Sequence, residues 1–333
     1  MLFRSDAKVF MVVDATKYYW QFALSEEAKD LTTFLTPFGK FRYQRAPMGL
    51  ASSSDECCRR GDLALAGIGN MIKLVDDILI FGRDEEEVFK TAREVFQRCQ
   101  VHGITLNKEK MQFGKRVSFA GMIISSEGIS PDPGKVDALT KFGVPKNITD
   151  LRSFIGLANQ LGMFVPDLAH VLEPLRELTS PKKAFVWIDV HQKAFEDTIR
   201  ILTDENGHVL KPFNPALETI LTTDASKSGL GFVLQQSDKA KRYMVCCGSR
   251  SLTPAERNYA PLELQALVFS LQCPDVVSTW LEENSRWSLI INHLCLFSTR
   301  RIWRQWKVHG CNESWQSVLD TPSRCCGSQA RTM

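Results

Sequence analysis

Two adjacent carboxylates interrupt an apolar run at residues 69–82, GNMIKLVDDILIFG. Asp76 and Asp77 fit two interpretations. Aspartate is common in tight turns, so the pair can simply mark a hairpin between two antiparallel strands. Alternatively, two like charges held together repel each other, and a divalent cation with a preference for oxygen ligands removes that cost. A third carboxylate, Asp14, ends another apolar run and can converge on the pair if the strands share one sheet.

The bulk composition describes an ordinary soluble protein. The chain has 333 residues, of which 44% are hydrophobic and 24% charged, enough for two or three domains. A net charge of +3 does not demand a nucleic-acid partner, and the basic clusters CCRRG and KRVSF fit either nucleic acid or solvent. The ten cysteines lack zinc-site spacing, and no segment is long enough for a signal peptide or a membrane span. We therefore expect an intracellular protein with reduced thiols, in the cytoplasm or nucleus, without membrane contact.

Periodicity and turn residues predict the elements that must position these carboxylates. A strand with Asp14 at its end runs into a short aromatic helix over 8–24, and a hairpin is expected within 34–50. An amphipathic helix is predicted at 84–102, with apolar Val88, Val95 and Phe96. Strands at 111–113 and 117–124 then precede a Pro/Gly-rich boundary at 128–135.

Beyond that boundary the chain reads as helical to about residue 185, with capping signals at Asn147 and Thr149. A second α/β segment starts near Trp187 and includes the strand-like ETILTTDAS. After about residue 272 the periodic patterns fade, while tryptophan and cysteine become frequent. This tail does not have the composition of a disordered segment.

Several motifs occur in one order along the chain. VVDATKYYWQFAL, FLTPFGKFRYQRAPMGL, LVDDILIFG, HGITLNKEKMQFGKRVSFAGMIISSEG and LRSFIGLANQLGMFV resemble the reverse transcriptase of gypsy-type LTR retrotransposon Pol polyproteins. TTDASKSGLGFVLQQ and SRSLTPAERNYAPLELQAL resemble the RNase H domain that follows it there. The resemblance spans roughly residues 8–272 and favours the metal-binding interpretation of the opening motif.

The resemblance implies a mixed α+β and α/β chain of four parts. It predicts a reverse transcriptase palm at 1–128, with an antiparallel sheet, helices and largely missing fingers. A helical thumb–connection follows at 129–185 and a truncated RNase H-like α/β domain at 186–272. The tail at 273–333 is then out of frame, as argued below.

The resemblance also implies RNA-directed DNA synthesis, with Asp14, Asp76 and Asp77 as catalytic metal ligands. Nucleotidyl transfer uses two Mg²⁺ ions about 3.5–4 Å apart, for which Mn²⁺ can substitute. The expected partners are RNA template, DNA primer, RNA–DNA hybrid and dNTPs; the sequence leaves the oligomeric state undefined.

Other family positions surround this site. Tyr19 matches the aromatic residue under the incoming sugar, although without the motif it would read as a core residue. Lys110 matches a lysine that assists proton transfer to pyrophosphate, and it also fits a solvated lysine. Gln44, Pro47 and Gly49 match the loop that shapes the template and nucleotide pocket. Phe119, Ala120 and Gly121 match the hairpin that grips the primer.

RNase H chemistry needs two metal ions and about four carboxylates. By resemblance Asp224 and Glu263 are catalytic metal ligands of that site. Without the resemblance, Asp224 fits a turn at a strand end and Glu263 an exposed glutamate on a helix. The next family carboxylate, in a Thr-Asp-His motif, is absent from the sequence. However, codons for residues 280–303 read from the third base of the first codon can encode VRGKFKVVTDHKPLVSIFNKEDL. We therefore hypothesise a frame disruption between about Leu271 and Trp280, with the later strands and RNase H activity lost.

The alternative is a degenerate, inactive remnant that at most binds nucleic acid. The missing fingers and altered family positions favour it: Tyr18 replaces a usual Gly, and Cys57-Cys58 replace a usual Phe-Gln. The intact Asp14, Asp76 and Asp77 favour the polymerase.

Overall fold

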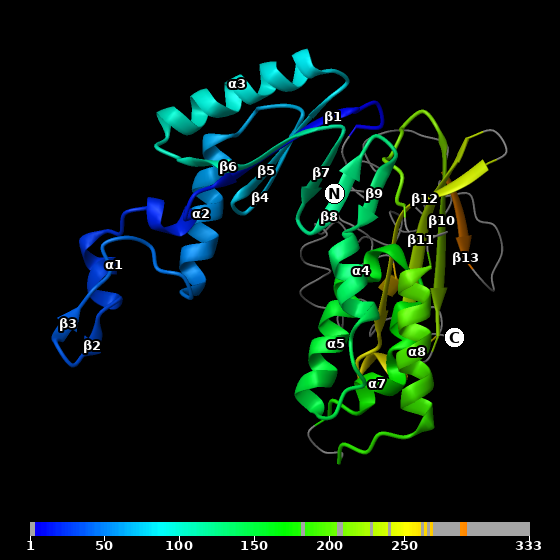
Figure 1. The fold of residues 1–333 in the computed structure, drawn as a ribbon. Helices are drawn as coiled ribbons and strands as arrows, with labels where there is room; N and C mark the ends of the chain where they lie inside the picture. Colours follow the sequence, from blue (N-terminus) through cyan, green and yellow to red (C-terminus); the bar gives the residue numbers. More distant parts are fainter. Residues whose placement is uncertain are drawn as a thin grey trace, which may run out of the picture. The chain divides into compact units, whose positions relative to one another are not determined.

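The computed structural model describes residues 4–180, 184–204, 209–226, 229–238, 241–260, 263–264, 267–268 and 287–291. The chain forms two compact units, whose elements are labelled in Figure 1. The first consists of Met1–Asp137 with Val209–Phe213, and the second of Ala138–His208 with Asn214–Met333. Within the described residues, no helix has the length and apolar content that a membrane span requires.

The first unit is built on an antiparallel sheet with the strand order β4–β5–β1–β6. The central strands are β5 (Asp77–Gly82) and β1 (Val9–Ala15), flanked by β4 (Met71–Leu74) and β6 (Leu106–Gly114). Every residue of β1 is buried except Asp14, which is partly exposed. A carboxylate at this place is expensive to desolvate unless a cation or hydrogen bonds compensate it.

Helix α3 (Glu85–Val101) covers one face of this sheet (Figure 1). Asp84 caps the helix by accepting the Glu87 amide at 2.9 Å, and the acidic first turn suits the helix dipole. Val88 and Val95 are fully buried against β1 and β5, so the predicted helix is confirmed. Phe96 is 39% exposed and lies outside this core, because the apolar stripe continues through Ala92 and Cys99 instead.

The remaining elements of the first unit follow the predicted order, with two corrections. The run at 117–124 is two strands, since Ala120 and Gly121 have φ of 52° and 72° and reverse the chain between them. The stretch predicted as a boundary at 128–135 is itself structured, because its first half pairs with the preceding strand, and the first unit continues to Asp137. The bounds are η1 (Tyr18–Gln21), α1 (Glu26–Leu31), β2 (Phe34–Thr36), β3 (Gly39–Phe41), α2 (Ala51–Ala64), β7 (Arg116–Phe119), β8 (Met122–Ser125), β9 (Gly128–Pro131) and α4 (Pro133–Thr140).

The second unit joins helices to a sheet with the order β12–β11–β10–β13. Asn147 accepts the Asp150 amide at 2.9 Å and caps the first long helix, as predicted. The rings of Phe154 and Phe195 lie 4.6 Å apart in the helical core. The bounds are α5 (Ile148–Leu161), η2 (Gly162–Phe164), α6 (Leu168–Val171), α7 (Glu173–Glu177), α8 (Asp189–Thr203), β10 (Glu218–Ala225), β11 (Gly229–Asp238), β12 (Lys241–Ser251) and η3 (Glu256–Asn258).

Strand β13 (Trp287–Ile291) lies in the stretch where the strands were expected to be lost. It pairs in parallel with β10, from Thr219 opposite Trp287 to Thr223 opposite Ile291. That expectation is therefore wrong for this strand: apolar and β-branched residues favour a strand in whatever frame they are encoded. The frame disruption concerns the DNA and stays a prediction.

Candidate active site

The β4–β5 hairpin carries Asp76 and Asp77 at its tip. Leu74 pairs with Asp77, which leaves Val75 and Asp76 as the connecting turn. Val75 has a φ of 55°, a left-handed conformation that is rare and costly for a β-branched residue. Such strain persists only where the surrounding structure imposes it, and it is concentrated at functional sites. Two-residue hairpin turns require a positive φ at this position, so the strain follows from the tight reversal that places Asp76 beside Asp77.

The sheet brings Asp14 to the same place. Asp14 and Asp77 are direct cross-strand partners in the β1–β5 ladder, and the Ala15 amide donates to the Asp76 carbonyl at 2.8 Å. Asp14, which is distant in the sequence from Asp76 and Asp77, thus shares one end of the sheet with them. Burial and the negative charges of Asp76 and Asp14 raise the pKa of Asp77, while Lys110 opposes this effect.

Lys110 reaches this cluster from a distortion of β6. Asn107 pairs with Asp14 and Gln112 with Val12, so residues 108–111 bulge out of the ladder. The Lys110 ammonium donates to Asp14 Oδ2 at 3.0 Å, and this bond raises the pKa of Lys110. Bulges commonly re-aim a side chain beside an active site. This bulge directs a cation onto Asp14.

The residue types here suit a hard divalent cation. Three carboxylates provide oxygen ligands, and their mutual repulsion makes a cation favourable. Their arrangement is less complete: among the described residues, no three His, Cys, Asp or Glu side chains are placed to hold a metal ion. Asp14 instead binds Lys110. The predicted ligands therefore share one end of the sheet without forming a closed ligand set.

The segment after Asp14 places Tyr19 beside helix α2. Tyr19 is partly exposed, and its hydroxyl lies 3.3 Å from Ser54 Oγ. Gln44 accepts the Leu24 amide at 3.1 Å, so the loop after β3 is joined to the segment that follows Tyr19. Pro47 is buried in this loop, and Gly49 has a φ of 96°, which favours glycine at the entry to α2.

The predicted primer-grip residues form the β7–β8 turn. Phe119 is 2% exposed and anchors the turn in the core. Ala120 and Gly121 both have positive φ, and a Cβ at Gly121 would lie 2.1 Å from the Lys135 Nζ. The turn is thus anchored on one side and faces a lysine on the other.

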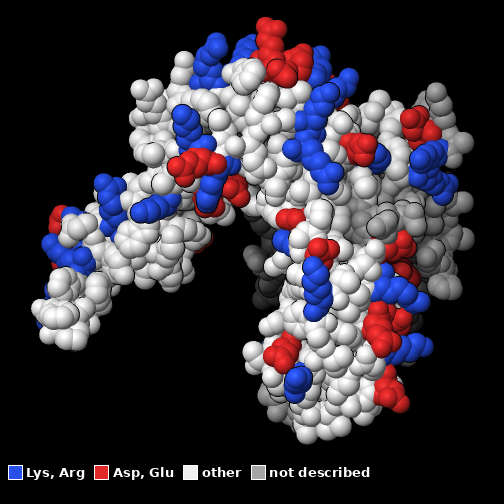
Figure 2. Space-filling view, in the orientation of Figure 1, with Lys and Arg blue, Asp and Glu red and all other residues white. Residues whose placement is uncertain are grey.

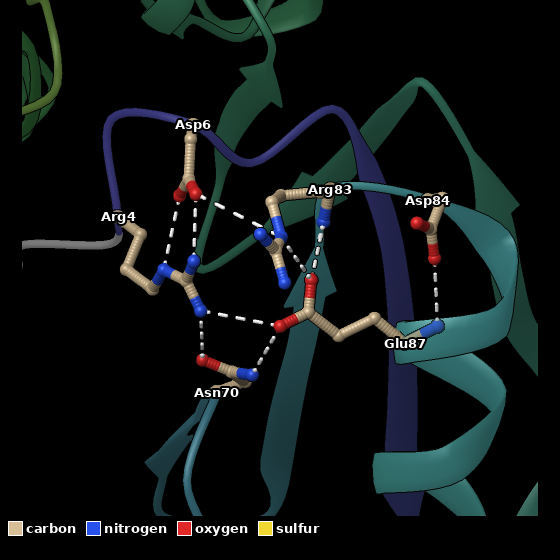
Figure 3. A network of polar contacts seen from close by, with 6 residues as sticks. All are labelled: Arg4, Asp6, Asn70, Arg83, Asp84 and Glu87. Atoms are coloured by element: carbon tan, nitrogen blue, oxygen red, sulfur yellow. Dashed lines mark hydrogen bonds and ion pairs between the residues drawn. The ribbon is translucent and has the colours of Figure 1, made fainter.

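A polar network that we did not predict secures the open end of the hairpin (Figure 3). Arg4 donates to Asp6 at 2.6 Å and to Asn70 and Glu87 at 3.2 Å. Glu87 also accepts from Asn70 at 3.0 Å and from the Arg83 amide at 2.8 Å. The network joins the N-terminal segment, β4 and α3. Its members are single polar residues without a motif, so no sequence pattern pointed to them.

The predicted RNase H residues lie in the second unit. Asp224 is exposed in β10 and pairs with Gly231 of β11. Glu263 is exposed and helical, and its carboxylate accepts the Ala260 amide at 2.8 Å, an arrangement typical of a helix N-terminus. These contacts fit an exposed glutamate on a helix at least as well as they fit a metal ligand. The region of the missing Thr-Asp-His carboxylate lies mostly outside the described residues.

The basic cluster CCRRG is partly neutralised by an acidic neighbour. Arg59 and Arg60 of CCRRG both donate to Glu56 at 2.7 Å, which offsets part of their charge. On the visible face of the first unit, positive and negative side chains are interspersed (Figure 2). Among the described residues, Cys57, Cys58, Cys99 and Cys247 form no disulfide.

Comparisons with known proteins agree with this arrangement. Residues 4–124 match the family described as reverse transcriptase (RNA-dependent DNA polymerase). Residues 187–278 match the RNase H-like domain found in reverse transcriptase. A foamy viral protease-reverse transcriptase, solved with an RNA/DNA hybrid, shares the fold at a TM-score of 0.71 and 18% identity, covering 95% of this chain and 43% of that one. The fold and the two matches define a reverse transcriptase segment followed by an RNase H-like domain.

The relatives specify the group. The chain is 30% identical over 260 residues to the Pol polyprotein of transposon 412 and over 286 residues to that of transposon gypsy, both from Drosophila melanogaster. These alignments cover 77% and 80% of this chain but only 21% and 27% of the relatives. Transposon Tf2-3 polyprotein of Schizosaccharomyces pombe is 28% identical over 79% of the chain and 20% of its own length. The chain belongs to the gypsy-type retrotransposon Pol proteins and spans about a fifth to a quarter of the length of these relatives.

Proposed function

We propose that the first unit is the catalytic core of an RNA-directed DNA polymerase that extends a DNA primer on an RNA or DNA template with dNTPs. The observation that carries this proposal is the cross-strand pairing of Asp14 with Asp77, with Asp76 on the adjoining strained turn. Reverse transcriptases generally use divalent metals, and the oxygen ligands of this cluster suit Mg²⁺ or Mn²⁺. Asp14, Asp76 and Asp77 are the side chains that would hold two such ions.

When bound, the ions would supply charge neutralisation at the triphosphate and activation of the primer hydroxyl. The protein's own residues position the reactants. Tyr19, five residues after Asp14, would offer its ring to the sugar, and the loop containing Gln44, Pro47 and Gly49 would shape the nucleotide pocket. The turn at Phe119–Gly121 orients the primer end, because its inner side is anchored by buried Phe119. Lys110 stands beside Asp14, where it can deliver a proton to pyrophosphate.

A primer-extension assay with Mg²⁺ on a homopolymer template tests this proposal. We expect the intact chain to extend the primer and Asp76→Asn to abolish extension while leaving the fold intact. Glu109→Gln is the matched control, because it removes an exposed carboxylate from the same unit outside the acidic cluster. Absence of extension by the intact chain, with primer-template binding retained, would refute the polymerase proposal.

A non-catalytic nucleic-acid-binding remnant is the second candidate. The observation in its favour is that no three candidate metal ligands among the described residues are placed to hold an ion. Binding without extension by both the intact chain and Asp76→Asn would support it. For the second unit we propose no RNase H activity, since Asp224 and Glu263 alone would hold a second metal ion poorly. Mg²⁺-dependent cleavage of an RNA–DNA hybrid by the purified chain would contradict this.

A further inference from the structure

The Asp14–Asp76–Asp77 cluster already contains one cation, the Lys110 ammonium. Its Nζ lies 3.0 Å from Asp14 Oδ2, a charge-assisted hydrogen bond of ordinary length. The negative charges of Asp76 and Asp77 also act on this ammonium. One lysine therefore interacts with all three candidate metal ligands.

The backbone is shaped for this contact. Residues 108–111 leave the β1–β6 ladder just where Asp14 joins it, so Lys110 stands on a bulge rather than in a regular strand. Its side chain is 64% exposed, whereas that of Asp14 is only 15% exposed. An exposed cation thus contacts a carboxylate that is mostly shielded from solvent, and turning the lysine into solvent displaces no core residue.

A divalent ion and this ammonium compete for the same oxygen. Mg²⁺ requires its ligand oxygens at about 2.0–2.1 Å, and a second cation about 3 Å from the same oxygen would repel it. We propose that Lys110 is the counter-ion of the Asp14–Asp76–Asp77 cluster in the metal-free protein, and that a divalent cation displaces it from Asp14 on binding. This inference rests on the proposed function, since it takes the cluster to be the metal site. It also accounts for a cluster whose ligands are not yet placed around an ion.

The proposal makes Lys110 a positioning residue that lowers metal affinity, which is the opposite of what a metal-binding or structural residue would do. The test is Mn²⁺ binding to the full chain, measured by electron paramagnetic resonance of free Mn²⁺ without primer or nucleotide. Lys110→Met should bind Mn²⁺ about three- to tenfold more tightly than the wild type. Lys110→Arg should bind like the wild type because it keeps the charge.

Lys108→Met is the matched control, because it removes the same charge two residues away on the same exposed segment. It should change the affinity less than about twofold. Asp14→Asn should weaken Mn²⁺ binding in every background and so identify the site. Equal affinities of Lys110→Met and Lys108→Met, including no binding by either, would overturn the proposal.

Hydrogen exchange gives a second readout that is independent of catalysis. In EDTA, the turn at 75–77 should exchange faster in Lys110→Met than in the wild type, because three carboxylates are left without a counter-ion. Mg²⁺ should restore protection. Unchanged exchange in EDTA would contradict the counter-ion role. Tighter Mn²⁺ binding by Lys110→Met without primer extension by the wild type would reject the polymerase proposal alone.

Discussion

Two departures from the family pattern contact each other in the core, and this contact gives a sharp prediction. Tyr18, at a usual glycine, is 3% exposed and donates its hydroxyl to the Cys57 carbonyl at 2.6 Å. Cys57, at a usual phenylalanine, is 1% exposed and belongs to the same apolar cluster. Gly61 leaves room for the hydroxyl, since a Cβ there would lie 2.2 Å from it. We expect the two substitutions to compensate each other, with the Tyr18 ring filling the space that the phenylalanine usual at position 57 would occupy.

The magnitudes follow from burial. Tyr18→Gly removes a buried aromatic side chain and should cost about 3–5 kcal/mol in the free energy of unfolding of the first unit. Cys57→Phe overpacks the same site and should cost about 1–3 kcal/mol. The double variant restores one ring to the shared space. The loss of stability in the double variant should therefore be about 1–3 kcal/mol smaller than the sum of the two single losses.

Native-state hydrogen exchange of the β1 and α2 amides measures this coupling, because it reports on the first unit separately from the second. Cys58→Phe is the matched control: the adjacent cysteine is only partly buried, so this substitution should not rescue Tyr18→Gly. Additive losses in the double variant, within about 0.5 kcal/mol, would refute the reasoning. They would leave the two departures as unrelated changes, as expected of a decaying sequence.

Three other perturbations test parts of the fold. Gly121→Ala should destabilise the β7–β8 turn by about 1 kcal/mol because of its positive φ, as seen by exchange of the turn amides, whereas Gly69→Ala, with open space around it, should have a smaller effect. Glu256 pairs with Arg250, which lowers the pKa of Glu256 to about 2. Because the folded-state pKa is depressed, the pair stabilises the fold above pH 5, and this effect is lost as the pH falls towards 2. Glu256→Gln should flatten that part of the acid denaturation curve, and an unchanged curve would contradict the role of the pair. Glu87→Gln should weaken the polar network at the hairpin's open end and speed amide exchange in β4, with a control in which Glu86→Gln leaves exchange unchanged.

Local patterns were sufficient for most of the elements around the site. The 84–102 helix, the hairpin at 76–77 and the cap at Asn147 depend on periodicity and on short-range hydrogen bonds, which neighbouring residues determine. The stretch predicted as a boundary at 128–135 also contains a strand, because pairing with β8 and the bridge from Ile129 to Leu210 order residues whose local Pro and Gly signals indicate only a turn. Similarly, the predicted strand at 117–124 was wrong because the chain reverses at Ala120 and Gly121.

The sequence by itself determined the candidate chemistry, because carboxylates in an ordered set of motifs identify a reverse transcriptase with an RNase H-like domain. Only the tertiary structure decided how these residues meet. The pairing of Asp14 with Asp77, the bulge that brings Lys110 to Asp14, and the contact of Tyr18 with Cys57 all join segments distant in the chain. Such contacts depend on strand register and on packing volume, which the identities of neighbouring residues do not specify.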